Sequence, residues 1–333
     1  MRAEHPELPC ELVAGLLRRY WGLDVAVSHA PVGFGSYHWV AFGRGGARWF
    51  VTADYLDPRG TWLGPHAEAV FGALTAAAGT TAMLAERGYE FVHPPRPDHA
   101  GVLVRRVLPR WAVQVFPYLD GWSTPDGAWE DADERTRIAA IVGRLHAATP
   151  PPMVRRWEFS VPGRADLMSA LDELALAWTG GPCAERTRAL LVESEKSIRA
   201  RLRRYDELAA QIQAAPDQWV VTHGEPHSAN VIRAPAGRMW LVDWDTVALA
   251  PRERDLAAFF DGSVEVLSAY QQAVGLVEPR RAALELFALW WALAEVCGYV
   301  QLFRQPHQDS SDSAESWRNL CHYAMQPADG AAQ

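Results

Sequence analysis

Hydrophobic and polar positions in the first 120 residues follow two different spacings. Residues 8–20 and 65–87 carry apolar side chains at helical spacing, and Gly88 ends the second of these stretches. Apolar runs of strand character occupy five other stretches: 25–33, 37–43, 47–55, 101–108 and 111–119. The GRGG segment at 43–46 indicates a hairpin turn. The pattern predicts a small antiparallel sheet with a packed helix.

The pattern changes at the FPYLDG segment, where Pro117 and Gly121 interrupt the strand-like run. We expect the chain to pass there from one lobe to the next. Further helices are predicted at 130–148, 164–178, 184–214 (ended by APDQ at 215–218) and over most of 252–305. Two short apolar runs, 219–224 and 238–245, are expected to pair as a hairpin. The polar tail after Pro306 is expected to be loose.

These elements predict an α+β fold in four consecutive parts. A lobe of sheet and helix covers residues 1–116, a hinge covers 117–121, a mainly helical lobe covers 122–306, and a polar segment covers 307–333. A chain of 333 residues exceeds what one hydrophobic core commonly serves, which favours two lobes.

Membrane and redox signals are weak in this chain. It lacks 18 consecutive apolar residues and an apolar signal-peptide core near its start. Its four cysteines, Cys10, Cys183, Cys297 and Cys321, form neither a CxxC pair nor a metal-binding spacing. We therefore expect a cytoplasmic protein without a membrane partner.

The formal net charge of −8 is unevenly distributed along the chain. Residues 1–120 carry 11 basic and 11 acidic side chains, whereas residues 121–333 carry 21 basic and 29 acidic ones. This balance argues against a nucleic-acid partner and permits a cationic small molecule. A solvated acidic surface would give the same count. Lys196 is the only lysine of the chain.

A loop rich in His, Glu and Asn, VVTHGEPHSANVI (220–232), is followed by the stretch WLVDWDTVALAPRERDL (240–256). The carboxylate of Asp243 and the amide oxygen of Asn230 are hard ligands, which suit Mg²⁺ when phosphates complete its coordination. Glu225 is placed to accept a proton from an incoming hydroxyl. The two stretches together predict phosphoryl transfer by positioning and electrostatics.

His227 lies between these residues in the sequence and is placed to meet a transferring phosphoryl group. Other interpretations stay open. A His beside a carboxylate is often an ordinary hydrogen-bonded pair, and the DWD carboxylates also suit a turn or a cap. A zinc site of His223, His227 and Asp243 has the right residue types, although Pro226 and the strand context oppose the helix that such spacing needs.

The combination of HGEPHSAN, LVDWD and APRERDL resembles the aminoglycoside phosphotransferase and choline kinase superfamily, and most closely the spectinomycin phosphotransferase-like enzymes. The resemblance covers most of the chain, and its two-part motif is specific. It implies a protein-kinase-like two-lobed fold, with a small antiparallel-sheet N-lobe and a mainly helical C-lobe.

The resemblance also implies roles for individual residues. Carried over by position, Glu225 and His227 are the catalytic pair and Asn230 and Asp243 bind Mg²⁺. His223 and Asp255 have structural roles in the catalytic loop, and Asp245 is a further candidate near the metal.

A nucleotide site is implied in the same way, with ATP or GTP as co-substrate. The GFGSYH segment, with Gly33, Gly35 and Ser36, would cover the phosphates. The backbone of Phe116, Tyr118 and Leu119 would meet the adenine.

The sequence departs from the family pattern at two positions. Glu225 stands where the family has Asp, and its carboxylate reaches about 1 Å further, a displacement that can cost about 10²-fold in rate. Thr52 stands where the family has the Lys that grips the phosphates. Arginines are the candidate replacements, because guanidinium pairs well with phosphate oxygens: Arg48, Arg105 and Arg106. The helix residues Glu68 and Glu86 lose the Lys as a partner.

Two classes of function follow from these observations. The first is an O-phosphotransferase that moves the γ-phosphate of a nucleotide to a hydroxyl of an aminoglycoside, an aminocyclitol or another polar cationic molecule. The second is a kinase-fold protein that binds a nucleotide or metabolite with weak or no transfer. Transfer of a nucleotidyl group is a third alternative. A role in antibiotic resistance and one in biosynthesis are both open.

The acceptor site is less defined by the sequence. Acidic candidates for a cationic acceptor are Asp261, Glu265, Glu285 and Glu295. Trp290, Trp291 and Tyr299 have a spacing that fits a helix core better than a platform for a sugar.

Overall fold

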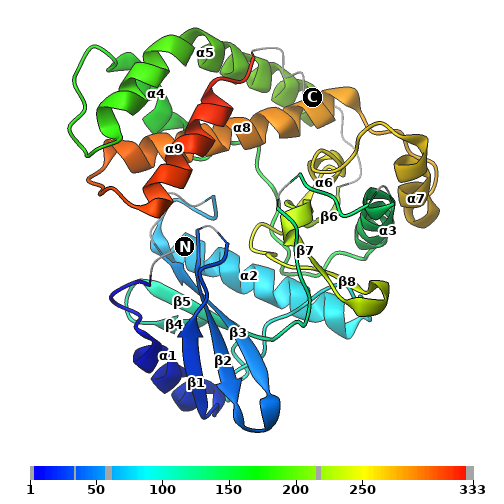
Figure 1. Ribbon diagram of the computed structural model, residues 1–333. Helices are drawn as coiled ribbons and strands as arrows, with labels where there is room; N and C mark the ends of the chain where they lie inside the picture. Colours follow the sequence, from blue (N-terminus) through cyan, green and yellow to red (C-terminus); the bar gives the residue numbers. More distant parts are fainter. Residues whose placement is uncertain are drawn as a thin grey trace.

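The computed structural model describes residues 4–33, 35–56, 62–125, 127–131, 133–214 and 219–327 (Figure 1). Phe34 of the GFGSYH segment and the APDQ segment at 215–218, which was expected to end a helix, lie outside the described residues. The remaining expectations can be compared with the structure element by element.

The N-terminal part forms a five-stranded antiparallel sheet in the order β1-β2-β3-β5-β4. Its strands are β1 (Val25–His29), β2 (Tyr37–Gly43), β3 (Arg48–Tyr55), β4 (Arg105–Val107) and β5 (Trp111–Pro117). The predicted hairpin joins β2 to β3, and Gly45 and Gly46 adopt positive φ angles of 71° and 83° there. Only glycine takes up such angles without steric cost, so the turn depends on them.

One helix packs on each face of this sheet. Helix α1 (Cys10–Leu16), extended by a wider turn to Trp21, covers the side that carries Val51 and Trp111. Helix α2 (Ala67–Glu86) covers the other side through Leu74 and its neighbours. Because side chains alternate along a strand, the even-numbered residues of β3 face away from α1.

The C-terminal part is mainly helical (Figure 1). Its helices are α3 (Glu134–His146), α4 (Arg164–Asp172), α5 (Ala184–Ala214), α6 (Glu253–Leu256), α7 (Val264–Val274), α8 (Arg281–Arg304) and α9 (Ser311–Ala324). Helix α3 packs against α7, and α8 packs against α4, α5 and α9. The fold is therefore α+β, with a small antiparallel sheet beside a larger helical region, as predicted.

The chain leaves β5 at Pro117 and enters the helical region beside β7 (Val231–Arg233). Trp122 and Arg233 exchange two backbone hydrogen bonds of 3.0 and 2.8 Å. A Cβ atom on Gly121 would lie 2.3 Å from the Arg233 carbonyl oxygen, so only glycine fits. The segment expected to be a hinge is thus held closely against the C-terminal part at its far end.

The strand pairing around the candidate loop differs from the prediction. The two short runs were expected to pair with each other, but β6 (Val220–Thr222) pairs with β9 (Ala248–Ala250). β7 pairs instead with β8 (Met239–Leu241), across the short turn Pro235–Gly237. The cause is the extra strand β7 directly after the loop, which lies nearer in sequence to β8 and takes it as partner.

The tail after Pro306 was expected to be loose, and this prediction is wrong. Helix α9 begins with a capping box in which Ser310 and Ser313 bond each other's backbone. Leu320 and Ala324 are fully buried against α8 and α5. The segment looks polar because small serines occupy part of its buried face.

Two helices, α2 and α8, are long and apolar enough by length and composition to be candidate membrane spans. Both are core helices here. In α8, 67% of the most apolar window is buried inside the protein, where it packs between other helices.

Candidate active site

The loop between β6 and β7 is supported from below by one carboxylate. Asp255, on α6, accepts hydrogen bonds from the backbone N–H groups of His223 (2.8 Å) and Gly224 (2.7 Å), and its Oδ2 lies 3.0 Å from His146 Nε2. Burial by itself raises the pKa of Asp255, but the hydrogen bond and charge of His146 outweigh burial and lower it. A charged carboxylate thus fixes the start of the loop.

His223 is fully buried, and both nitrogens of its ring are in use. Nε2 lies 3.0 Å from the Val242 carbonyl oxygen, and Nδ1 accepts the backbone N–H of Glu225 at 3.2 Å. Burial lowers its pKa to about 4, which keeps the imidazole neutral. A ring in this state has no lone pair left for a metal. Among the described residues, no three His, Cys, Asp or Glu side chains are arranged as a metal site, so the zinc alternative is not supported, and a Mg²⁺ ion at Asn230 and Asp243 would need phosphate oxygens to complete its coordination.

Glu225 and His227 face each other across the loop. Their Oε2 and Nε2 atoms are 3.9 Å apart, and both side chains are largely buried. Burial, followed by the nearby charge of Asp243, raises the pKa of Glu225 to about 8, while Arg254 and a hydrogen bond with Thr246 oppose this shift. A carboxyl group with such a pKa can exchange a proton near neutral pH.

The structure brings Asn230 next to Asp243. The backbone N–H of Val242 donates to the Asn230 carbonyl (3.0 Å), which holds the two segments side by side. Asn230 Nδ2 donates to the Glu225 carbonyl at 3.0 Å, so the NH₂ end of the amide faces the loop and its oxygen remains as a ligand atom. Asp243 has a positive φ of 65°, which is uncommon outside glycine and typical of a functional turn.

Carboxylates gather around this pair. Part of the Asp243 side chain is exposed, but the protein groups around its carboxylate displace water and so raise its pKa. The charge of His227 opposes this shift. The pKa of Asp245 is raised well above its usual range by burial, then by the charges of Asp54, Asp243 and Glu225. Oxygen ligands of this kind fit Mg²⁺, whose charge would relieve their mutual repulsion.

Asp54 of β3 reaches the same place from the sheet. It is 8% exposed, and its Oδ1 accepts a hydrogen bond of 2.5 Å from the Ser36 hydroxyl. Its Oδ2 is buried and has no hydrogen-bond partner among the described residues. Burial raises its pKa to about 6, with a further contribution from Asp243. Sequence reasoning missed Asp54, although strand alternation places it on the same face as Thr52.

The arginines that were candidates to replace the lysine lie elsewhere. Arg48 pairs with Asp120 and stacks on Tyr118 at 4.3 Å. Arg105 pairs with Asp98. Arg106 pairs with Glu68, which accounts for one of the helix glutamates. The structure therefore brings none of these guanidinium groups to the position beside Thr52.

The residues expected at the nucleotide lie beside two inner strands of the sheet, before the start of β2 and at the end of β5. Gly33 and Gly35 precede β2 with φ angles of 70° and 91°. Phe116 is the last residue but one of β5, where its ring stacks on His93 at 5.8 Å. The backbone N–H of Tyr118 is occupied by the Arg48 carbonyl at 3.1 Å. Leu119 follows in the connection.

Most of the acidic candidates for an acceptor contact are far from this chemistry. Asp261 pairs with Arg135 at 2.8 Å, Glu285 pairs with Arg204 at 2.6 Å, and Glu265 is exposed in the first turn of α7. Glu295 of α8 is the exception, since its charge contributes to the raised pKa of Glu225.

Two of the three aromatic candidates on α8 belong to the helical core, and the third lies beside His227. Trp290 and Tyr299 are buried in the helical core, as the spacing suggested. The ring of Trp291 lies 6.2 Å from that of His227, and its Nε1 donates to the Tyr323 hydroxyl at 3.0 Å. Helix α9 thus supports an aromatic side chain beside the candidate catalytic pair.

Arg254 and Thr246 lie behind the loop and were not predicted from the sequence. Arg254 donates to the Thr222 hydroxyl (2.9 Å) and to the Thr246 carbonyl (3.0 Å). A Cβ atom on Gly224, whose φ is 104°, would lie 2.4 Å from both Arg254 and Thr246. No local signal marks these contacts, because they depend on how β6, β9 and α6 pack.

A small antiparallel sheet, a helical region, and a loop of Glu, His and Asn facing an Asp after a short strand together define a protein-kinase-like phosphotransferase fold. The model of the phosphotransferase enzyme family (APH) matches residues 64–287, about two thirds of the chain. The chain belongs to this family. No curated protein matches the sequence significantly.

Solved structures agree with this assignment of the fold. Spectinomycin phosphotransferase APH(9)-Ia, in complex with ADP and spectinomycin, superposes with a TM-score of 0.72 at 16% identity and covers 98% of this chain and 100% of its own. The amicoumacin kinase hAmiN, in complex with AMP-PNP, Ca²⁺ and its substrate, has a TM-score of 0.60 at 14% identity, covering 98% and 97%. Choline kinase LicA from Streptococcus pneumoniae has a TM-score of 0.53 at 12% identity, covering 94% and 98%.

Proposed function

We propose that this protein transfers the γ-phosphate of ATP or GTP to a hydroxyl group of a small polar molecule. The observation that carries the proposal is the convergence of Glu225, His227, Asn230 and Asp243 at one end of the sheet. An acceptor hydroxyl, a phosphoryl group and a divalent cation each need one of these kinds of side chain within a few ångströms.

In this proposal each residue has one task. Asn230 and Asp243 would hold Mg²⁺, with Asp245 as an additional carboxylate, and the bound ion would supply positive charge to the phosphate oxygens. Glu225 orients the acceptor hydroxyl and takes its proton. His227 donates to the phosphoryl group, while His223 and Asp255 hold the loop in place.

The structural neighbours support a nucleotide and a divalent cation as partners. They include complexes with ADP, AMP, AMP-PNP and Ca²⁺, and one neighbour is an aminopropanol kinase with a TM-score of 0.57 at 15% identity. The phosphoryl acceptors that their names indicate are small molecules. We propose a small hydroxylated acceptor here as well, and a cytoplasmic location for the reaction.

A second candidate function is nucleotide or metabolite binding without transfer. The observation that favours it is the face of β3 that meets the site, where Asp54 lies two residues after Thr52 and the lysine implied by the resemblance is absent. A triphosphate placed there meets carboxylates from both sides, so its binding depends wholly on cations.

The two candidates are separated by following phosphate transfer directly. Phosphorus NMR of ATP and Mg²⁺ with a panel of amino alcohols, amino sugars and hydroxy acids should show a new phosphate ester with at least one acceptor. The Asp243→Ala variant should show none while unfolding at a similar temperature. Equal transfer by Asp243→Ala would overturn the metal assignment, and binding of ATP without any ester would favour the second candidate.

A further inference from the structure

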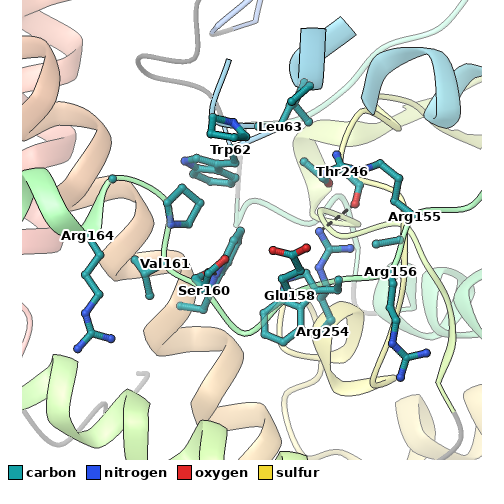
Figure 2. A pocket seen from close by; sticks show the side chains of 18 of the residues that line it. Trp62, Leu63, Arg155, Arg156, Glu158, Ser160, Val161, Arg164, Thr246 and Arg254 are labelled. Carbon is teal, nitrogen blue, oxygen red and sulfur yellow. Dashed lines mark hydrogen bonds between the residues drawn. The ribbon is translucent and has the colours of Figure 1, made fainter. Parts of the chain in front are cut away.

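A pocket of about 840 Å³ lies directly beside the candidate loop (Figure 2). Its walls come from the segment 155–166 that leads into α4, from the start of β9 and the residues before it, from α6 and α8, and from the segment 62–65 before α2. The volume is in the range of sites that hold drug-sized molecules. The pocket is therefore large enough for a whole metabolite.

The pocket reaches the catalytic pair through intervening side chains. Thr246 lines it, and the Thr246 hydroxyl, which donates to the His223 carbonyl at 3.2 Å, is near enough to the Glu225 carboxylate to oppose the rise in its pKa. Trp62 lines it on the opposite side and packs edge-on against Trp291, with ring centroids 5.0 Å apart. Trp291 is in turn the neighbour of the His227 ring. A molecule in the pocket is thus one side chain (Thr246) away from Glu225 and two side chains (Trp62 and Trp291) away from His227.

Aromatic rings form much of the apolar wall. Trp62, drawn above the pocket in Figure 2, also packs edge-on against Trp290 at 5.2 Å. Trp290 is fixed by its Nε1, which donates to the Ser160 carbonyl at 2.7 Å, and by contact with Trp157 at 6.2 Å. Fixed rings of this kind offer flat apolar surface to a ligand at little entropic cost.

The charge of the lining has the opposite sign to that of the chain. The protein carries −8, yet the pocket is lined by four arginines and two acidic residues: Arg155, Arg156, Arg164, Arg254, Glu158 and Asp166. Arg164 and Asp166 are engaged with side chains outside this group of six. Arg164 points away from the pocket in Figure 2 and pairs with Asp206 at 2.5 and 2.7 Å, and Asp166 accepts a hydrogen bond from Gln301.

The remaining charges leave a positive excess. Arg156 stacks on Trp219 at 3.8 Å and stays exposed. The exposed guanidinium of Arg155 makes no hydrogen bond or ion pair with any described residue. Arg254 is only 6% exposed, and although its Nε finds no hydrogen-bond partner within the described part of the chain, its charge is balanced by the nearby carboxyl groups of Asp255 and Glu225. The two exposed arginines, Arg155 and Arg156, therefore stand against the single carboxylate of Glu158.

We propose that this pocket binds the acceptor through a carboxylate or phosphate group, held by Arg155 with Arg254 behind it, while the tryptophans cover the apolar part. The identification of the ligand as acceptor rests on the proposed phosphotransfer, whereas the preference for an anion does not. The substrate class is thus a hydroxylated acid or zwitterion rather than a purely cationic amino sugar. Bidentate contact of a guanidinium with a carboxylate supplies the selectivity.

Three compounds of one skeleton test the charge preference: phenylserine, its decarboxylated analogue and its deaminated analogue. All carry the same ring and alcohol, and they differ in being a zwitterion, a cation and an anion. Ligand-observed NMR titration of the full chain should show the zwitterion and the anion binding about tenfold or more tighter than the cation. Equal or tighter binding of the cation, or binding of none of the three, would overturn the proposal.

Variants then locate the anion. Arg155→Glu should weaken the two acids about tenfold, and Arg155→Gln by a smaller factor, while Arg203→Glu, an exposed position on α5, should leave them unchanged. Unaltered binding of the acids by both Arg155 variants would contradict the assignment. Titration of the same samples with ATP and Mg²⁺ separates the two claims. If the acids bind and ATP does not, the phosphotransfer fails and the anion site stands; if ATP binds without a preference for acids, the reverse holds.

Discussion

At the scale of single residues, the family resemblance implies that Glu225 stands at the position of a hydroxyl-orienting aspartate. The longer side chain is accommodated in a specific way, because its carboxylate reaches Thr246 and lies 3.9 Å from His227. Burial and the charge of Asp243 raise its pKa to about 8, so in the metal-free protein it is mostly protonated at neutral pH. A bound cation is expected to lower this pKa and prepare the base.

Glu225→Gln should lower kcat by about 10²-fold or more, because the amide cannot accept the proton of the acceptor. The affinity for Mg²⁺-ATP should change little, since Asn230 and Asp243 are untouched. Steady-state kinetics and a nucleotide titration measure the two effects separately. Glu265→Gln, at an exposed position, is the matched control, and a normal kcat in the Glu225→Gln variant would remove Glu225 from the mechanism.

At the scale of elements, β3 is the strand on which the family resemblance implies a lysine that this chain lacks. Its even-numbered residues face away from α1, and they present Thr52 and then Asp54, whose Oδ1 binds Ser36. The Thr52 hydroxyl is buried without a hydrogen-bond partner among the described residues. The strand therefore places an acid and an unpaired hydroxyl where a cation is usual.

Removing the carboxylate of Asp54 and placing a lysine at position 52 should each strengthen nucleotide binding. Asp54→Asn should tighten Mg²⁺-ATP by roughly three- to tenfold, because it removes a carboxylate opposite Asp243. Thr52→Lys should tighten Mg²⁺-ATP on the order of tenfold through a charge-assisted contact. Thr75→Lys on the exposed side of α2 controls for net charge. Weaker ATP binding by Asp54→Asn would show that Asp54 helps to bind the nucleotide, which would contradict this prediction.

Helix α9 is the second element whose role had to be revised. It was expected to be loose, but Leu320 is fully buried and Tyr323 accepts the hydrogen bond of Trp291. Its serines are small enough to pack inside, so composition alone could not distinguish a solvated tail from a docked helix.

Leu320→Ala should lower the free energy of unfolding by about 2–4 kcal/mol, because it leaves a cavity between α9 and α8. Leu276→Ala is the matched control, since that side chain is 93% exposed and should change the stability by less than about 0.5 kcal/mol. Urea unfolding gives both values. Equal stability of the two variants would mean that α9 is not docked in solution.

Local signals in the sequence could be interpreted, whereas long-range packing could not. The strands of the sheet and the residues of the loop were predictable, because hydrophobic spacing and a specific motif are local signals. The pairing of β6 with β9, the approach of Asp54 and the position of Arg254 behind Gly224 depend on packing between distant segments. The same holds for the pocket, whose arginines are scattered along the chain between residues 155 and 254.

At the scale of the whole molecule, carboxyl groups with raised pKa values are concentrated where Asp54 of β3 meets the candidate loop and the residues after β8. For Glu225 the folded-state pKa of about 8 lies above the ordinary value of 4.5. The folded protein then holds a proton that the unfolded chain has lost. The stability of the metal-free protein therefore falls as pH rises from about 4.5 to 8.

Binding of Mg²⁺-ATP should release protons for the same reason, on the order of one per site at pH 7. Calorimetry in two buffers with different heats of ionisation measures this number. Glu225→Gln should release fewer protons than the unmodified protein. Binding without any proton release would contradict the account of a protonated, metal-free cleft.

The most direct test of the central claim is a calorimetric titration of the protein with ATP and with GTP, each with and without Mg²⁺. We expect at least one nucleotide to bind only when Mg²⁺ is present. Among the described residues, Arg48 and Arg105 are paired with other side chains, and Thr52 takes the place of the lysine. A cation held by Asn230 and Asp243 is therefore needed to bind the phosphates. Asp243→Ala should abolish that binding. If neither nucleotide binds with Mg²⁺, or if binding is equally strong without it, the proposal that this site handles a metal-bound nucleotide is wrong.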